Sequence, residues 1–260
     1  MTSQAQPTSH LYIITGASRG LGHALALQLL GPPNTLLTLA RHTSASLQEQ
    51  AQQTDGPLTQ WPVDLADARA ASQELSAWLG KLDAASFATA TLVNNAGVIP
   101  AITPLRQANA ADIANALRVG LEAAMLLTAS FLGATSAWPG QRRVLNISSG
   151  LGRRPMASQA TYCAAKAGMD LFTRCVALEE AAVPNGARVC ALAPGVIDTS
   201  MQARLRSADA QSFPDVAYFQ GLHDSNSLAD AAVVAERIAA FVAHPDFGQE
   251  VIARIDALPL

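Results

Sequence analysis

Short apolar runs alternate with helix-patterned segments along almost the whole chain, and this alternation limits the possible folds more than any other feature. The runs are rich in leucine and β-branched residues, which favours strands that are buried on both faces. Strands separated by helices in this way are typical of one doubly wound α/β domain with a mostly parallel sheet. The predicted strands cover residues 10–15, 34–40, 58–63, 90–93, 143–148, 187–192 and 250–255.

Helix-patterned segments fill the intervals between these strands. The first helix ends near residue 30, and others are predicted over residues 44–53, 67–79, 111–137, 158–182 and 228–243. Asp67 is expected to cap the third helix. Residues 201–227 follow no regular pattern. Long excursions inside a compact domain are often functional, so we interpret residues 199–227 as a substrate lid.

Composition restricts the class of function. Half of the residues are hydrophobic and the formal net charge is −3 at pH 7, which argues against a nucleic-acid or membrane-surface partner and favours a small-molecule ligand. The first nine residues are polar, so we predict a disordered tail over residues 1–9, no secretory signal, and one domain over residues 10–260 in the cytoplasm. The three scattered cysteines lack metal-ligand spacing, fit a reducing compartment and predict no metal site.

A glycine-rich turn directly follows the first predicted strand. It reads TGASRGLG, with Gly16, Gly20 and Gly22 leading into a helix. Strand, glycine turn and helix form the context in which dinucleotides bind, because small residues let the backbone approach a pyrophosphate and the helix N-terminus offers free N–H groups. The spacing differs from Gly-x-Gly-x-x-Gly, and an ordinary tight connection remains the alternative for this turn alone.

The residue after the second predicted strand bears on the choice of cofactor. NAD-binding folds usually place a carboxylate there to hold the ribose 2′-hydroxyl, whereas this chain has Arg41, with Arg19 in the glycine turn. Guanidinium groups bind a 2′-phosphate bidentately, and a carboxylate would repel it. The pattern predicts NADP(H), with two solvated surface arginines as the alternative.

Tyr162 and Lys166 stand one helical turn apart in a predicted helix, so their side chains are expected to share a face. A nearby ammonium favours the phenolate and would lower the pKa of the phenol, which suits a proton donor at neutral pH. Ser149 follows the fifth predicted strand, at the edge where open parallel sheets bind ligands. For the Tyr-x-x-x-Lys spacing by itself, a half-buried tyrosine and a solvated lysine are the alternative.

These motifs in this order resemble the short-chain dehydrogenase/reductase family. The resemblance covers residues 10–256, and residues 162–166, 177–180 and 193–202 are most similar to the sepiapterin reductase and benzil reductase-like branch. It implies a Rossmann-type domain whose seven strands lie in the order 3-2-1-4-5-6-7. The motifs that carry the resemblance are Thr15-Gly16-x-x-x-Gly20-x-Gly22, Asn94-Asn95-Ala96-Gly97, Ser149, Tyr162-x-x-x-Lys166 and Pro194-Gly195.

The resemblance implies an NADPH-dependent carbonyl reductase that transfers a hydride between NADP(H) and a small ketone, diketone or pterin-like side-chain carbonyl. It implies that Tyr162 protonates the developing alkoxide, Ser149 hydrogen-bonds the same oxygen, and Lys166 holds the nicotinamide ribose. Ser149 is preferred over Ser148 because the family serine stands thirteen residues before the tyrosine.

The resemblance also implies the set of cofactor contacts. Within that set, Asp64 is expected near the adenine, Asn94 beside the adenine ribose and Thr199 at the nicotinamide carboxamide. The full set is Gly16, Ser18, Arg19, Gly20, Leu21, Gly22, Arg41, Asp64, Leu65, Asn94, Ala96, Gly97, Tyr162, Lys166, Pro194, Gly195, Val196, Ile197 and Thr199.

Two positions depart from the family pattern. Gly120 stands where the family usually has an asparagine that supports a water chain to the lysine. It leaves room for an extra water, impairs the proton path, or marks a kink. Ile252 aligns with the aspartate that anchors the pterin in sepiapterin reductases, which argues against a pterin substrate. Gly120 is the one feature favouring an alternative function, an NADP-binding sensor or scaffold with little catalysis.

An oligomer is also expected. Residues 117–138 form the most apolar long stretch, which we interpret as a buried or dimer-forming helix because charged and hydroxyl side chains interrupt it. In the family, the helices that correspond to residues 111–137 and 158–182 pack against a second subunit. We therefore expect a homodimer or homotetramer.

Overall fold

A computed structural model describes residues 8–258 of the 260-residue chain. Most of the predicted N-terminal tail, residues 1–7, lies outside the described residues. Ser9 already belongs to the first strand, so the boundary predicted after residue 9 is too late.

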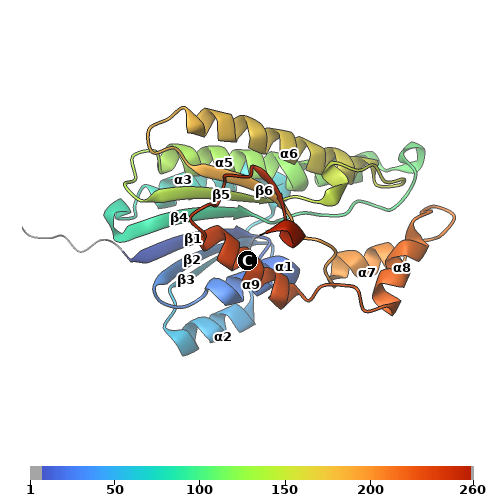
Figure 1. The fold of residues 1–260 in the computed structure, drawn as a ribbon, viewed down its shortest axis with the longest axis horizontal. Coiled ribbons are helices and arrows are strands. Elements are labelled where there is room, and N and C mark those ends of the chain that lie inside the picture. The colour runs from blue at the N-terminus through green and yellow to red at the C-terminus, as the bar shows by residue number, and fades with distance from the viewer. Residues whose placement is uncertain (1–7, 259–260) are drawn as a thin grey trace, which may run out of the picture.

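Seven strands form one sheet in the order β3-β2-β1-β4-β5-β6-β7, and every neighbouring pair is parallel (Figure 1). The predicted fold class and strand order are confirmed. Strand β4 begins three residues earlier than predicted. Ala88 and Thr89, near its start, are only half-buried and give a weak apolar signal in the sequence. The strands are β1 Ser9–Thr15, β2 Asn34–Ala40, β3 Leu58–Pro62, β4 Phe87–Asn94, β5 Gln141–Ile147, β6 Arg188–Ala193 and β7 Ile252–Arg254.

Helices cover both faces of the sheet, as the alternation of patterns predicts (Figure 1). Successive residues of β1 supply the two cores, because side chains alternate along a strand. Tyr12 and Ile14 pack toward one helical layer, while Leu11 and Ile13 pack toward the other. The first layer contains α1 Gly20–Leu29, α2 Ala45–Thr54 and α9 Ala231–Ala243, and the second contains α3 Ala68–Leu79, α4 Ala110–Leu117, α5 Ala123–Ala134 and α6 Ala160–Ala181.

The long helix predicted over residues 111–137 contains a π-helical turn, Arg118–Glu122, between α4 and α5. Gly120 lies in this turn and is buried against α6, where an added Cβ would stand 3.4 Å from the Cβ of Ala165. The kink that Gly120 was expected to mark therefore takes the form of a π turn. The combined helix, Ala110–Ala134, is long and apolar enough to cross a membrane by composition, yet it packs against α3 and α6.

The capping prediction for Asp67 is wrong. Asp67 stands at the N-cap of α3, but its side chain makes no capping hydrogen bond there. Asp64 instead caps the preceding 3-10 turn, where its Oδ1 accepts from the backbone N–H of Ala66 at 3.0 Å. Because this 3-10 turn precedes α3, the first free backbone N–H groups lie next to Asp64 and not next to Asp67.

The segment predicted to be irregular contains two short helices, α7 Ser200–Arg206 and α8 Val216–Asp224. They project together from the carboxyl-terminal edge of the sheet (Figure 1). Between them, Phe213 is fully buried and stacks on Phe219 with ring centroids 5.7 Å apart. The two helices therefore belong to one apolar cluster, which also contains Ile99, Met156 and Tyr162.

Candidate active site

A cleft of about 1140 Å³ opens at the carboxyl ends of the strands. Residues that follow each strand from β1 to β7 form its walls, together with α7 and α8. Every predicted catalytic and cofactor-binding residue lines it except Asn94. The lining of the cleft includes both the glycine turn and Tyr162, so a dinucleotide and a small substrate fit one continuous space.

The glycine turn forms a backbone cradle at one end of this cleft. Gly16 has a φ of 71°, and a Cβ there would lie 2.9 Å from the Cα of Ala96. At Gly22 a Cβ would lie 2.5 Å from the carbonyl oxygen of Gly16. Helix α1 begins at Gly20, and its N-cap residue, Arg19, makes no side-chain capping bond. Small residues and uncapped N–H groups fit a pyrophosphate at this helix end.

Two arginines line the cleft near the end of β2. Arg19 and Arg41 are both exposed, and neither forms an ion pair with another described residue. The strand itself ends at Ala40, so no carboxylate occupies the position that would hold a ribose 2′-hydroxyl. Both guanidinium groups are thus available to a ligand phosphate.

Asn94 does not line the cleft, in contrast to the prediction. Its side chain is 3% exposed and donates to Thr128 Oγ1 at 3.0 Å and to Asn146 Oδ1 at 2.8 Å, inside the sheet. Asn95 lines the cleft instead, and its Nδ2 donates to the carbonyl oxygen of Thr15 at 2.8 Å. Side chains alternate at a strand end, so a shift of one residue exchanges the buried and exposed positions.

Ser149, Tyr162 and Lys166 meet at the other end of the cleft. Ser149 follows β5 and caps a 3-10 turn, with its Oγ accepting from the backbone N–H of Leu151 at 3.2 Å. Tyr162 and Lys166 share the buried face of α6, 9% and 4% exposed. Lys166 Nζ donates to the carbonyl oxygen of Ile147 at 2.7 Å and lies 5.9 Å from the centroid of the Tyr162 ring. The three predicted groups are therefore brought together.

Burial controls the protonation of this cluster. It raises the pKa of Tyr162, and hydrogen bonding with Ser149 opposes that increase. Burial lowers the pKa of Lys166 to about 8, while the charge of Asp170 acts in the opposite direction. The expected lowering of the Tyr162 pKa is not found, because desolvation of the phenol is the largest influence on this pKa and raises it. At neutral pH the phenol holds its proton and can only donate it.

Apolar side chains line the cleft beyond Tyr162. The predicted lid contributes Met201, Tyr218 and Phe219 to them. Leu222 and His223, which belong to the same segment, do not line the cleft. Met156 and Leu205, which no sequence pattern indicated, are buried beside Tyr162 in one apolar cluster.

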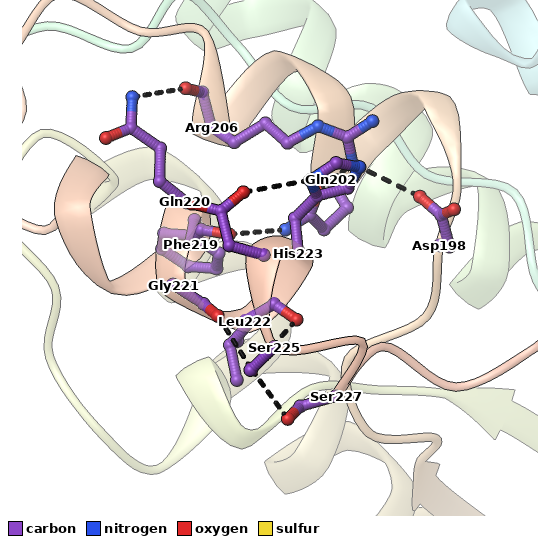
Figure 2. Close-up of polar contacts among 11 residues, drawn as sticks. Asp198, Gln202, Arg206, Phe219, Gln220, Gly221, Leu222, His223, Ser225 and Ser227 are labelled. Atoms are coloured by element: carbon purple, nitrogen blue, oxygen red, sulfur yellow. Dashed lines mark hydrogen bonds and ion pairs between the residues drawn. The ribbon is translucent and has the colours of Figure 1, made fainter.

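A polar network joins the two helices of the segment 199–227 (Figure 2). Gln202 is 3% exposed, and its Nε2 donates to the carbonyl oxygen of Phe219 at 3.0 Å. Arg206 donates to Gln202 Oε1 and to Asp198 Oδ1, the latter at 3.1 Å. Gln220 Nε2 donates to the carbonyl oxygen of Arg206 at 3.1 Å. These bonds fix α8 against α7.

The two ends of the segment meet at its base. Ile197 and Ala229 form a parallel bridge. The Asp198 N–H donates to the Ala229 carbonyl oxygen at 3.0 Å, and the Ala229 N–H donates to the carbonyl oxygen of Val196 at 3.0 Å. The chain therefore leaves the sheet and returns to it at one point.

Sequence analysis also missed polar groups around the catalytic cluster. Arg153 and Arg154 line the cleft, and Asp170 lies beside Lys166 without being part of the lining. One sequence signal could have identified Asp170. It is an acidic residue four positions after Lys166, on a helix face that is otherwise mostly apolar.

Comparisons with known proteins give one consistent result. A family model described as short chain dehydrogenase matches residues 10–210. The chain is 33% identical over 244 residues to benzil reductase ((S)-benzoin forming) of Bacillus cereus, over 94% of this chain and 98% of that protein. It is 30% identical over 249 residues to sepiapterin reductase of Rattus norvegicus, over 90% and 92% respectively. A structure with bound NADP, of a protein assigned as a 2-deoxy-d-gluconate 3-dehydrogenase from Agrobacterium tumefaciens, matches with a TM-score of 0.77 and 25% identity over 94% of this chain and 93% of that chain.

Proposed function

The chain belongs to the short-chain dehydrogenase/reductase family of oxidoreductases, and on that premise we propose that it is an NADPH-dependent carbonyl reductase of small ketones or diketones. One observation carries the proposal. A buried phenol that keeps its proton stands with Ser149 and Lys166 at one end of a cleft whose other end is a phosphate cradle. A proton donor and a dinucleotide site in one space are what carbonyl reduction requires.

The residues of this cluster have separate tasks in the proposed reaction. NADPH, when bound, supplies the hydride. Tyr162 donates its proton to the carbonyl oxygen as negative charge develops there, and Ser149 donates a hydrogen bond to the same oxygen. Lys166 stands where its ammonium can hold a ribose hydroxyl and return a proton toward the phenol. Burial excludes water, so these interactions act in a medium of low polarity.

Arg19 and Arg41 support the choice of NADPH over NADH. Both line the cleft, Arg41 directly after β2 and Arg19 in the glycine turn, and a 2′-phosphate is the ligand group that exposed guanidinium groups suit. Binding of NADP by the related dehydrogenase structure is in line with this choice. We assign the remaining predicted cofactor contacts to the residues that line the cleft, and we leave Asn94 out of them.

An apolar carbonyl compound suits the substrate end of the cleft. Met156, Met201, Leu205 and Phe219 line it, and residues 199–227 would close over the substrate as a lid. The name of the Bacillus cereus relative points to an aromatic diketone. The argument against a pterin is weaker than expected, because Ile252 does not line the cleft.

The first experiment follows NADPH oxidation by absorbance with benzil, other diketones, quinones, aldehydes and sepiapterin, and repeats each assay with NADH. We expect turnover of at least one diketone and a preference for NADPH. Tight binding of NADPH without any turnover would contradict the proposal. It would favour an NADP-binding sensor or scaffold, the alternative suggested by Gly120 in place of the family's asparagine. A Gly120→Asn variant would then test for an impaired proton path.

We further propose a cytoplasmic homodimer, or a homotetramer built from it, with residues 10–260 as one domain. Leu171 and Leu178 lie seven positions apart on α6 and are 64% and 75% exposed, and Met125 on α5 is 42% exposed. Exposed leucines two turns apart on one helix suit a subunit contact. Light scattering should show that Leu178→Glu shifts the protein toward the monomer, whereas Val233→Glu, an equally drastic change on α9, should not. A monomeric parent protein would contradict the assembly without affecting the proposed chemistry.

A further inference from the structure

A buried carboxylate lies one helical turn beyond Lys166. Asp170 is 6% exposed on α6, and its Oδ1 accepts a hydrogen bond from the Ser148 hydroxyl. Its Oδ2 lies 3.2 Å from Arg153 Nε, in an ion pair that lacks the alignment of a hydrogen bond. Burying a carboxylate costs free energy unless its charge is paired, and the contacts with Ser148 and Arg153 offset that cost for Asp170.

Both partners of Asp170 belong to the loop that carries Ser149. Ser148 precedes the catalytic serine directly, and Arg153 ends the 3-10 turn that Ser149 caps. Between them, Gly152 rests on α6 so closely that a Cβ would lie 2.9 Å from the carbonyl oxygen of Lys166 and 3.1 Å from Asp170 Oδ2. The loop is thus fastened to the helix on both sides of Ser149.

The charges around Asp170 are mostly positive or neutral. Lys166 shares its helix, and Arg153 approaches from the loop after β5. From β6, the Cys190 thiol faces the same region, and burial raises its pKa to about 12, which keeps it neutral. The phenol of Tyr162 is neutral as well. Asp170 therefore supplies the negative charge that opposes the desolvation of the Lys166 ammonium.

We propose that Asp170 is a positioning residue whose carboxylate fastens the Ser149 loop to helix α6, one helical turn from Lys166. It contacts neither substrate nor cofactor, and it acts through Ser149 and Lys166. The inference rests on the proposed function only for its consequence in turnover, because the effect on Lys166 exists without any substrate.

The chain offers a direct readout of Lys166. Lys81 and Lys166 are its only lysines, so a protein labelled with carbon-13 at lysine Cε gives two signals, which a Lys81→Arg variant assigns. Lys166 should titrate near pH 8 in the parent protein. In Asp170→Asn it should titrate at lower pH, because the amide keeps the shape and loses the charge. In Arg153→Gln it should titrate at higher pH, because the cation that pairs with Asp170 is removed and the carboxylate acts on Lys166 alone.

Turnover provides the second readout. Asp170→Asn should reduce kcat about tenfold to a hundredfold, which is the loss expected from misplaced catalytic groups. The alkaline limb of its pH profile should move to lower pH, so that lowering the pH restores part of the activity. Glu179→Gln removes one negative charge from an exposed position of the same helix, and it should change neither readout.

Each outcome bears on the inference separately from the proposed function. An unchanged titration of Lys166 in Asp170→Asn would overturn the inference, whatever the activity. A parent protein that reduces no carbonyl would defeat the proposed function, while the titration would still report on Asp170. If Asp170→Asn fails to fold, Arg153→Gln keeps the test open, since a titration that does not move upward would equally contradict the proposed charge balance.

Discussion

The inner end of the cleft and its rim are built in different ways. At the inner end, Tyr162 and Lys166 are buried and bonded to groups that the sheet and α6 hold in place. At the rim, Arg19 and Arg41 are exposed, and α7 and α8 are held to each other by side-chain hydrogen bonds (Figure 2) and to the domain by an apolar cluster. The groups of the proposed reaction are therefore positioned by the buried core. The side chains that recognise ligands lie at the surface, where they can change without disturbing that core.

The largest expected effect comes from the inner end. Tyr162→Phe should reduce kcat by about 10²–10⁴-fold, because the proton donor is lost and a hydrophobic ring of the same size remains. NADPH affinity, measured by fluorescence titration, should change less than about threefold, which is about 0.65 kcal/mol of binding free energy. Tyr12→Phe removes the same atom from β1, outside the cleft, and is the matched control. Near-normal turnover by Tyr162→Phe would refute its role.

An intermediate effect is expected at the adenine end of the rim. Arg41→Asp should weaken NADPH binding at least tenfold, about 1.4 kcal/mol, because a carboxylate replaces a cation beside the 2′-phosphate. NADH binding should weaken less. Arg69→Asp makes the same change at an exposed position of α3 outside the cleft. Equal losses for the two cofactors would show that Arg41 does not select between them.

A smaller effect is expected at the substrate end of the rim. Gln202→Leu removes the buried bond to Phe219 and leaves its carbonyl without that donor, at a cost of about 1 kcal/mol. Substrate KM should rise roughly fivefold on this basis, with kcat and NADPH affinity changed less. Gln220→Leu, which removes an exposed bond of the same network, is the control. A collapse of kcat in Gln202→Leu would instead tie the rim to the inner end.

The smallest effect compares stability in the two regions. Gly133 in α5 and Gly221 in α8 both have open space around the position of a Cβ. An alanine in a helix is favoured over glycine by about 1 kcal/mol. Urea unfolding should therefore show nearly this gain for Gly133→Ala. Gly221→Ala should raise the global unfolding free energy less, and should mainly slow proteolysis within residues 199–227. Equal global gains would mean that the lid unfolds together with the core.

Sequence patterns were most informative for the buried sheet and least informative for the rim. Apolar runs located all seven strands, because both faces of a parallel sheet are covered and the signal is continuous. The helices α7 and α8 were missed, since each is short and buries few side chains. Their order depends on contacts such as that of Gln202 with Phe219, which no periodicity reveals.

Within the site, the motifs identified residues better than they identified their environment. Ser149, Tyr162 and Lys166 do meet, as the spacing and the resemblance predicted. Asn94 was expected at the cofactor, yet Asn95 lines the cleft, because which of two adjacent residues faces the cleft depends on where the strand ends. The pKa of Tyr162 was misjudged because the spacing to Lys166 indicates a charge but says nothing about desolvation.

The bridge between Ile197 and Ala229 brings the two ends of residues 199–227 to one point. Because the chain departs and returns there, a segment of different sequence could be grafted with both junctions preserved, provided that it also replaces the bonds that Arg204 and Ser212 make to Ile99 and Ser158. Variation in the substrates accepted could then arise by replacing a single contiguous stretch, while Tyr162, Lys166 and the glycine cradle are inherited unchanged.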